Sequence, residues 1–185
     1  MRMVHCGTKT IETERLILRR FREDDAEAMF RNWASDPEVT KFLTWPTHES
    51  VDISGLIISD WIKSYEKDDS YNWAIELKEI GEVIGSIGSV NNSEEINRVH
   101  IGYCIGRKWW NKGIMSEALS AVIRFFFEEV QVNKVESRHD VNNIGSGRVM
   151  QKCGMTYEGT LRQSDKNNLG ISDVAYYGIL RSEYK

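Results

Sequence analysis

Three short runs rich in β-forming residues, at 71–77, 82–90 and 99–105, constrain the fold of this chain more than any other feature. Polar turns separate the runs, which is the pattern of an antiparallel meander of strands. The segment that follows, 114–129, is strongly apolar and has the periodicity of a helix. Its expected inner face is formed by Met115, Ala118, Leu119, Val122, Ile123 and Phe126.

The remaining segments alternate between strand and helix patterns. Strands are expected at 13–20, 134–141, 155–161 and 172–180, helices at 23–33, 39–43, 51–65 and 143–153, and a polar loop at 163–170. Together with the meander, the order is β-α-α-β-β-β-α-β-α-β-β. This order predicts an α/β chain of the mixed α+β kind, with a mostly antiparallel central sheet flanked by helices. No linker or repeat divides the sequence, so we expect a single domain over 1–185, with its core at about 13–180.

Composition disfavours several classes of function. A formal net charge of −4 argues against a nucleic-acid-binding protein, which normally has a surplus of basic residues. The longest apolar stretches, such as 121–127, are too short to span a membrane, and the first residues lack the apolar core of a signal peptide. The expected location is therefore the cytoplasm. The cysteines, Cys6, Cys104 and Cys153, form no C-x-x-C pair, so reduced thiols are expected rather than a disulfide or metal site.

The turn at 107–113, just before the apolar helix, has the properties of an anion site. The first turn of a helix exposes N–H groups without intrahelical partners and carries partial positive charge. Gly113 lets the backbone approach a phosphate, and Lys112 adds a positive charge. A diphosphate suits such a surface, although a plain helix start with a solvated lysine explains the same residues. The turn matches neither a P-loop nor a dinucleotide-binding glycine pattern, which disfavours nucleoside triphosphates and NAD.

Motifs around this turn resemble those of a known enzyme family. The sequences IGYCI at 101–105 and WNKGIMSEAL at 110–119 are similar to the acetyl-CoA motif of GNAT N-acetyltransferases. The resemblance extends from 13 to 180 through TERLILR at 13–19, DVNNIGS at 140–146 and KCGM at 152–155. It is strongest with the Rim-type branch, which includes ribosomal-protein N-terminal acetyltransferases.

This resemblance implies which residues bind acetyl-CoA, and it implies no metal. The pyrophosphate of acetyl-CoA would be bound by the backbone amides of Lys112, Gly113, Ile114, Met115 and Ser116. Because the backbone makes these contacts, Met115 is compatible with them, although the superfamily usually has Gly or Ala in its place. The strand residues Tyr103, Cys104 and Ile105 would separate from the neighbouring strand and pair with the pantetheine arm.

Two residues at the start of the helix at 143–153 have implied roles at the thiol end of the cofactor. Asn143 stands where the family uses an Asn side chain to hold the pantetheine arm, and it is equally a typical helix N-cap. If Asn143 holds the arm, Asn142 can cap the helix instead. Ser146 falls near the expected thiol position and would protonate the departing thiolate, although a serine in the first turn of a helix is commonplace. Cys104 is expected to be a small buried residue and not a nucleophile.

An amine must be neutral to attack a thioester, so a general base is useful. Relatives in the family often carry Glu immediately before the sequence IGY, and this chain has His100 there. An imidazole titrates near neutrality and can take the proton, but His100 is equally readable as a partly exposed surface residue. Glu76 is a second candidate for the base or for binding the amine.

The sequence therefore predicts an acetyl-CoA-dependent N-acetyltransferase that acts on a primary amine. The implied acceptor pocket lies between the early helices and the loop at 163–172, where Trp33, Phe42 and Trp45 either line it or pack in the core. The branch resemblance favours a protein N-terminal α-amine of the ribosomal-protein type, and antibiotic, polyamine and amino-acid amines stay open. A non-catalytic acyl-CoA-binding module is the rival from another class, and a general phosphate-binding protein is a third alternative. A homodimer is compatible with the branch.

Overall fold

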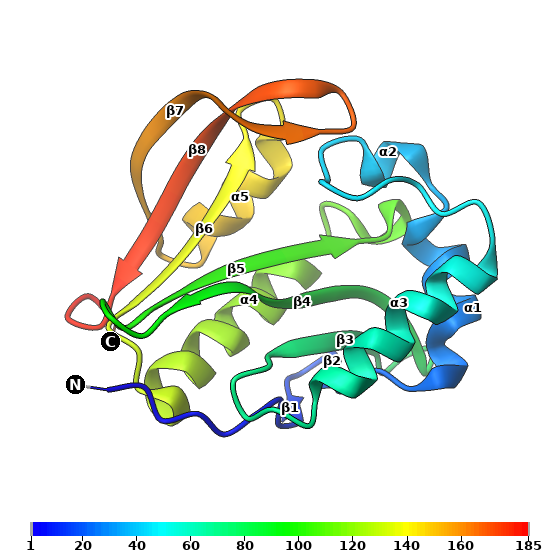
Figure 1. Cartoon of the computed structure of the whole chain (residues 1–185), viewed down its shortest axis with the longest axis horizontal. Coiled ribbons are helices and arrows are strands. Elements are labelled where there is room, and N and C mark those ends of the chain that lie inside the picture. Colours follow the sequence, from blue (N-terminus) through cyan, green and yellow to red (C-terminus); the bar gives the residue numbers. More distant parts are fainter. Residues whose placement is uncertain (1, 185) are drawn as a thin grey trace.

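A computed structural model describes residues 2–184 and places all of their strands in one eight-stranded sheet (Figure 1). The strand order is β1-β2-β3-β4-β5-β6-β8-β7. Within it, β5 and β6 pair in parallel and every other neighbouring pair is antiparallel, so the predicted fold class is confirmed. The strands are β1 (Ile11–Glu12), β2 (Leu16–Arg19), β3 (Asn72–Leu77), β4 (Glu82–Ser93), β5 (Arg98–Ile105), β6 (Lys134–Asp140), β7 (Thr156–Asn167) and β8 (Gly170–Leu180).

Helices cover both faces of the sheet. They are α1 (Ala26–Met29), α2 (Pro37–Thr40), α3 (Val51–Ser64), α4 (Ile114–Phe125) and α5 (Ile144–Lys152), and short 3₁₀ or π turns adjoin several of them at Glu23–Asp25, Phe30–Ala34, Arg107–Trp109 and Phe126–Val130. Figure 1 shows α4 on one face, with α1 and α3 on the other. All six residues of the predicted inner stripe are buried, so the apolar helix packs as its sequence indicates. None of the helices described is long and apolar enough to cross a membrane.

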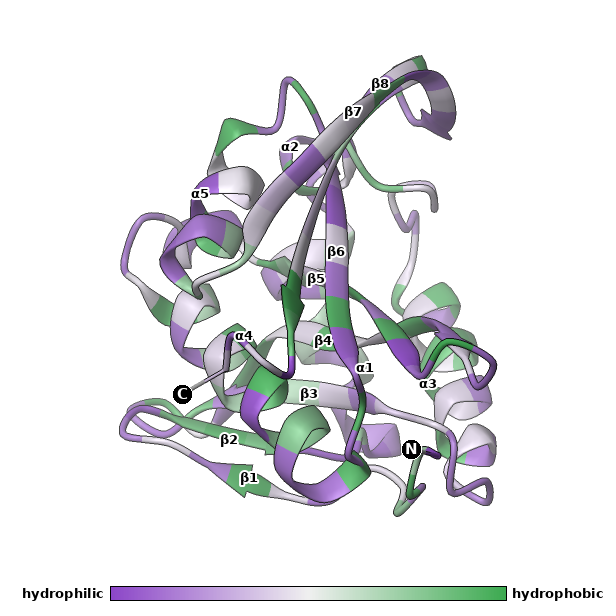
Figure 2. Ribbon diagram, turned by 90° about the vertical axis from the view of Figure 1, so that its left-hand side faces the viewer, coloured by the Kyte–Doolittle hydropathy of each residue, from purple (hydrophilic) through white to green (hydrophobic). Residues whose placement is uncertain are grey.

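The expected polar loop at 163–170 is wrong, because β7 continues to Asn167 and turns into β8 at Gly170. This strand is the outer edge of the sheet, and most of its side chains are exposed, so it lacks the apolar alternation of a half-buried strand. Figure 2 shows its ribbon mainly in pale and purple colours, the intermediate and hydrophilic end of the scale. Register shifts at Tyr157/Gly159 and Leu161/Asp165 interrupt the pairing further, which is a common way to protect an edge strand.

The sheet opens between β5 and β6. Their parallel pairing runs only from Arg98↔Lys134 to Ile101↔Ser137. Beyond this point β5 follows β4 while β6 follows β8, and Figure 1 shows the two strands diverging. The predicted separation of residues 103–105 from their neighbour is thus present in the fold.

Candidate active site

A cleft of about 630 Å³ lies where the sheet opens. It collects side chains from β4, β5 and β6, from the start of α5, from the segment after α2 and from the β7–β8 hairpin. Among the residues that line it are Phe42, Trp45, Trp61, Val90, His100, Tyr103, Cys104, Arg138, Asn143, Ser146, Asp165 and Asn167. Five of the predicted site residues therefore share one cavity: His100, Tyr103, Cys104, Asn143 and Ser146. Within residues 2–184, no group of three or more His, Cys, Asp or Glu side chains is placed to hold a metal ion.

The turn before α4 has the backbone shape expected of an anion site. Gly113 takes a left-handed conformation, φ 73° and ψ 2°, and α4 starts at the next residue. The N–H of Glu117 makes the first intrahelical bond, to the Gly113 carbonyl at 3.0 Å, so the amides of Ile114, Met115 and Ser116 have no partner within the helix. The side chains of Ile114 and Met115 are buried in the core, and only their backbone groups can meet a ligand.

The N-terminal part of the chain braces this turn, a feature that the sequence analysis missed. The Arg15 guanidinium donates to the Lys112 carbonyl at 2.9 Å and to Glu117 Oε2 at 2.6 Å. Glu117 also accepts bonds from the Thr13 hydroxyl and from the Arg15 amide, at 2.6 and 2.9 Å. Burial acts to raise the pKa of Glu117, but these donors outweigh it and hold the pKa below its usual range. Glu117 therefore stays ionised in the first turn of α4. Its bonds to Thr13 and Arg15 hold the turn at 107–113 against the segment before β2.

The start of α5 faces β5 through a pair of hydroxyl groups. Tyr103 donates its phenolic O–H to the Ser146 carbonyl at 3.0 Å, and Ser146 Oγ donates to the Tyr103 hydroxyl at 3.0 Å. Burial raises the pKa of Tyr103, which keeps the phenol protonated at neutral pH. Asn143 caps α5, because its Oδ1 accepts the Ser146 N–H at 3.4 Å. Asn142 does not cap the helix and is bonded instead to Asp140.

The open edge of β5 leaves fewer backbone groups free to pair with a ligand than the sequence predicts. The Gly106 N–H donates to the Ile84 carbonyl at 2.9 Å, which sets the alternation of the antiparallel β4–β5 ladder. By this alternation the backbone N–H and C=O of Cys104 point toward β4, while those of Tyr103 point into the opening between β5 and β6. The Ile105 carbonyl also points that way, but Trp110 Nε1 already donates to it at 2.9 Å. The side chain of Cys104 lies against Ser86 Oγ at 3.4 Å, and burial raises the pKa of its thiol, as expected for an inert cysteine.

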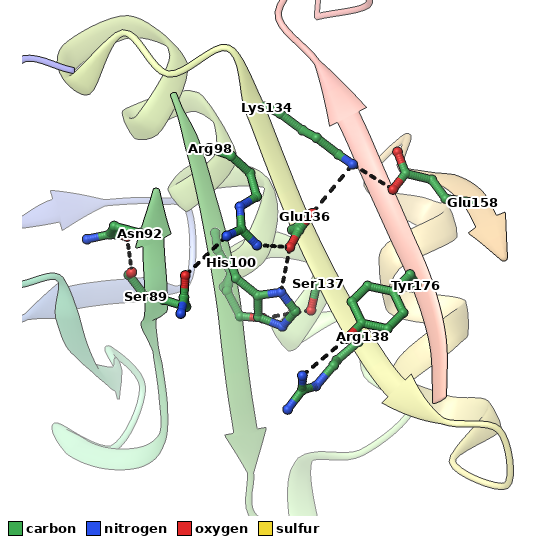
Figure 3. A network of polar contacts seen from close by, with 12 residues as sticks. Ser89, Asn92, Arg98, His100, Lys134, Glu136, Ser137, Arg138, Glu158 and Tyr176 are labelled. Carbon is green, nitrogen blue, oxygen red and sulfur yellow. Dashed lines mark hydrogen bonds and ion pairs between the residues drawn. The ribbon is translucent and has the colours of Figure 1, made fainter. Parts of the chain in front are cut away.

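His100 is a buried residue of the cleft wall, so the alternative of an exposed surface histidine is wrong. It stands opposite Glu136 in the parallel ladder, and its Nδ1 lies 3.0 Å from Glu136 Oε1 (Figure 3). Burial lowers the pKa of His100, and the neighbouring carboxylate only partly offsets this. The imidazole is therefore neutral at pH 7, the form that can accept a proton.

Two sequence-derived candidates lie elsewhere. Glu76 accepts a bond from Arg19 Nε at 2.5 Å and does not line the cleft, which speaks against its use as the base. Trp33 is fully buried in the core between the sheet and α1, whereas Phe42 and Trp45 line the cleft, one of the two alternatives that the sequence left open.

The β7–β8 hairpin closes one side of the cleft, and its tip is bonded to the end of α2 and to the segment after it. Asn168 Nδ2 donates to the carbonyls of Thr40 and Trp45, both at 2.8 Å. Asn167 Nδ2 donates to the buried Asp140 Oδ2 at 2.6 Å. This side of the cleft is thus built from segments that lie far apart in the sequence, since Asn168 is 128 residues from Thr40 and 123 from Trp45.

Comparison with known proteins agrees with this geometry. A family model described as an acetyltransferase (GNAT) domain matches residues 15–156. The chain is 32% identical over 176 residues to a Bacillus licheniformis protein called uncharacterized N-acetyltransferase p20, and the match covers 95% of this chain and 98% of that protein. It is 26% identical over 157 residues to the [ribosomal protein uS5]-alanine N-acetyltransferase of Escherichia coli, covering 80% and 79% of the two chains. The crystal structure of a GNAT-family acetyltransferase from Bacillus anthracis superimposes with a TM-score of 0.82 at 26% identity, over 95% of this chain and 100% of the other.

Proposed function

This chain belongs to the GNAT acetyltransferase family, and from that premise we propose that it moves the acetyl group of acetyl-CoA to a primary amine held beside His100. Acetyl-CoA supplies an activated acetyl group as a thioester. The observation that carries the proposal is the opening of the sheet after the pair Ile101↔Ser137. The cleft there combines an unpaired strand edge, the start of a helix and a neutral imidazole, which are groups that acyl transfer to an amine can use.

Residues on the α4 and α5 side of the opening fit the cofactor. In our proposal the amides of 112–116 bind the pyrophosphate, and the backbone of Tyr103 pairs with the pantetheine arm. Asn143 uses its Oδ1 to cap α5, and in the described part of the chain its Nδ2 has no protein partner, so it can donate to the arm as well. The capping and binding roles of Asn143 are therefore compatible.

A protein N-terminal α-amine is the acceptor that we favour. Support comes from the likeness to an enzyme whose name specifies an alanine of ribosomal protein uS5. A small-molecule amine is the second candidate, because the hairpin tip fastened by Asn168 encloses the acceptor side of the cleft. The two classes differ in what extends beyond the amine, and the products distinguish them directly.

The test is incubation with acetyl-CoA and a mixed library of peptides and small amines, followed by mass spectrometry of the products and measurement of thiol release. Peptides that gain an acetyl group at the α-amine support the first candidate, and acetylated polyamines, amino acids or antibiotics support the second. Tight binding of acetyl-CoA with no release of thiol on addition of any amine would favour a non-catalytic binding module and would contradict the proposal.

Replacing His100 by glutamine is expected to lower kcat about a hundredfold at saturating amine, the usual contribution of a general base. Acetyl-CoA affinity, measured by calorimetry, should stay near that of the wild type because His100 lies on the acceptor side of β5. In the wild type, kcat/KM should rise with pH through a pKa below 6.5, since burial lowers the pKa of this imidazole. An unchanged kcat in His100→Gln would eliminate it as the base.

Ser146 is proposed to protonate the departing thiolate, and its contact with Tyr103 allows a sharp test. Ser146→Ala should reduce kcat about a hundredfold, at the lower end of acid catalysis. Tyr103→Phe should reduce it less, because the Ser146 hydroxyl loses only the acceptor of its own proton. The reverse ranking, measured as steady-state thiol release at equal acetyl-CoA saturation, would assign the acid role to the phenol of Tyr103.

A further inference from the structure

A network of buried charges lies directly behind His100. Glu136 on β6 is only 7% exposed and has three partners on the acceptor face of the sheet (Figure 3). Its Oε1 contacts Arg98 Nη1 and His100 Nδ1, and its Oε2 lies 3.4 Å from Lys134 Nζ. Lys134 is shared with Glu158 of β7 at 2.6 Å. Two cations and one imidazole therefore converge on a single carboxylate.

The register of the β5–β6 ladder explains why these side chains meet. His100 pairs with Glu136 and Arg98 with Lys134, so all four lie on one face of two adjacent strands. The pair after His100↔Glu136 is the last one before the sheet opens. The network is thus fixed to the paired part of the strands, and the imidazole stands at the point where the cleft begins.

The protonation of the contact follows from its chemistry. Burial acts to raise the pKa of Glu136, but the bonds from His100 and Arg98 outweigh it and keep the pKa below its usual range. The carboxylate is therefore ionised at neutral pH and can only accept hydrogen bonds. His100 must then donate from Nδ1, and a neutral imidazole has a single N–H. Its lone pair consequently resides on Nε2, on the other side of the ring from Glu136.

We propose that Glu136 is a positioning residue for acetyl transfer, which holds His100 in the Nδ1-protonated tautomer and leaves Nε2 free to take the proton of the amine. The inference rests on the proposed function, in which His100 is the base. Nε2 gains the proton that the amine loses as the N–C bond forms, and the imidazolium so produced faces the negative charge of Glu136. The sulfur that leaves with the electrons of the C–S bond receives its proton on the opposite side, from Ser146. The Ser146 oxygen regains a proton from solvent, and the imidazolium of His100 returns one to solvent.

The charges around His100 decide how its titration responds to each substitution. Glu136 raises the pKa of His100, whereas Arg98 and Arg138 lower it alongside burial, the largest cause. Arg138 is itself paired with Asp165 at 2.8 Å, and the uncharged ring of Tyr176 lies 6.2 Å from the imidazole. Removing the carboxylate and removing the guanidinium should therefore shift the pKa of His100 in opposite directions. A kcat/KM limb set by a group other than His100 would show no such opposition.

The experiment compares Glu136→Gln with Arg98→Met. Glutamine keeps an oxygen that can accept from Nδ1 but removes the charge. The kcat should fall about tenfold, the value of one charged hydrogen bond. The acidic limb of the kcat/KM profile should move to lower pH. In Arg98→Met the same limb should move to higher pH. Glu82→Gln is the matched control, because it removes a carboxylate bonded to Arg31 outside the cleft, and both kcat and the pH profile should stay unchanged.

Nuclear magnetic resonance of the imidazole nitrogens gives a readout that does not need the acceptor. The His100 signals can be assigned by their loss in His100→Gln, and in the wild type they should show the Nδ1-protonated tautomer. This measurement needs no Glu136 variant, so it tests the inference even if Glu136→Gln fails to fold. An Nε2-protonated tautomer, or limbs that shift in the same direction in both variants, would overturn the inference. If no amine is acetylated, the same resonances still follow the titration of His100. The Nδ1-protonated tautomer with opposite shifts in the two variants would then keep Glu136 as the group that sets the tautomer of His100 and would reject the proposed function instead.

Discussion

Replacing Gly113 by valine is expected to weaken acetyl-CoA binding about a thousandfold. At φ 73° a branched side chain is strained, and the strain favours withdrawal of the backbone from the left-handed region that starts α4. The new methyl groups would also cover the amides that we propose as the pyrophosphate site. Loss of two charge-assisted hydrogen bonds, each worth about 1.5–3 kcal/mol, corresponds to this change in Kd. Isothermal calorimetry with acetyl-CoA measures it directly.

Gly81 provides a matched control for this substitution. It also has a positive φ, 63°, and lies in the turn between β3 and β4 with no atom within 4 Å of an added Cβ. Gly81→Val should therefore show a similar loss of thermal stability with an unchanged Kd for acetyl-CoA. If Gly113→Val bound acetyl-CoA like the wild type, or if both variants lost affinity equally, the turn before α4 would not be the pyrophosphate site.

The sequence predicts the fold best where side chains are buried in a regular pattern. The meander of β3, β4 and β5 and the inner face of α4 are confirmed because burial on one face dictates their periodicity. The far end of β7 was missed for the opposite reason. Its residues are exposed and its pairing with β8 is broken by register shifts, so its backbone bonds hold it in the sheet without leaving a pattern in the side chains.

The same distinction applies to the candidate site, where local motifs are predictable and contacts between distant segments are not. Local motifs place Tyr103 and Asn143 in the cleft and predict the helix start after Gly113, because these features depend on the backbone of a strand end or a helix start. The charges behind His100 depend on the pairing of β5 with β6, and Glu136 is 36 residues away from it in the sequence. Nothing local to Glu136 marks it as a partner. The same is true of Arg15 and Glu117, which meet across 102 residues.

The largest effect on stability is expected for Arg19→Met, which should lower the free energy of unfolding by about 3–5 kcal/mol, the cost of leaving buried charges without their partner. Arg19 on β2 is 8% exposed and donates twice to Asp25, both at 2.8 Å, and once to Glu76 at 2.5 Å. Methionine fills a similar volume but leaves both carboxylates without the guanidinium. Urea unfolding followed by circular dichroism measures the change.

Arg31→Met is the control, because Arg31 pairs with Glu82 on the surface, where 55% and 44% of the two side chains are exposed. An exposed pair contributes about 0–1 kcal/mol, so this variant should unfold near the wild-type urea concentration. Combining Arg19→Met with Asp25→Asn and Glu76→Gln should recover part of the loss, since the two carboxylates are then uncharged. If Arg19→Met unfolded like the control, Glu76 would not be held by a strong buried ion pair, and the argument against it as a catalytic base would rest only on its position outside the cleft.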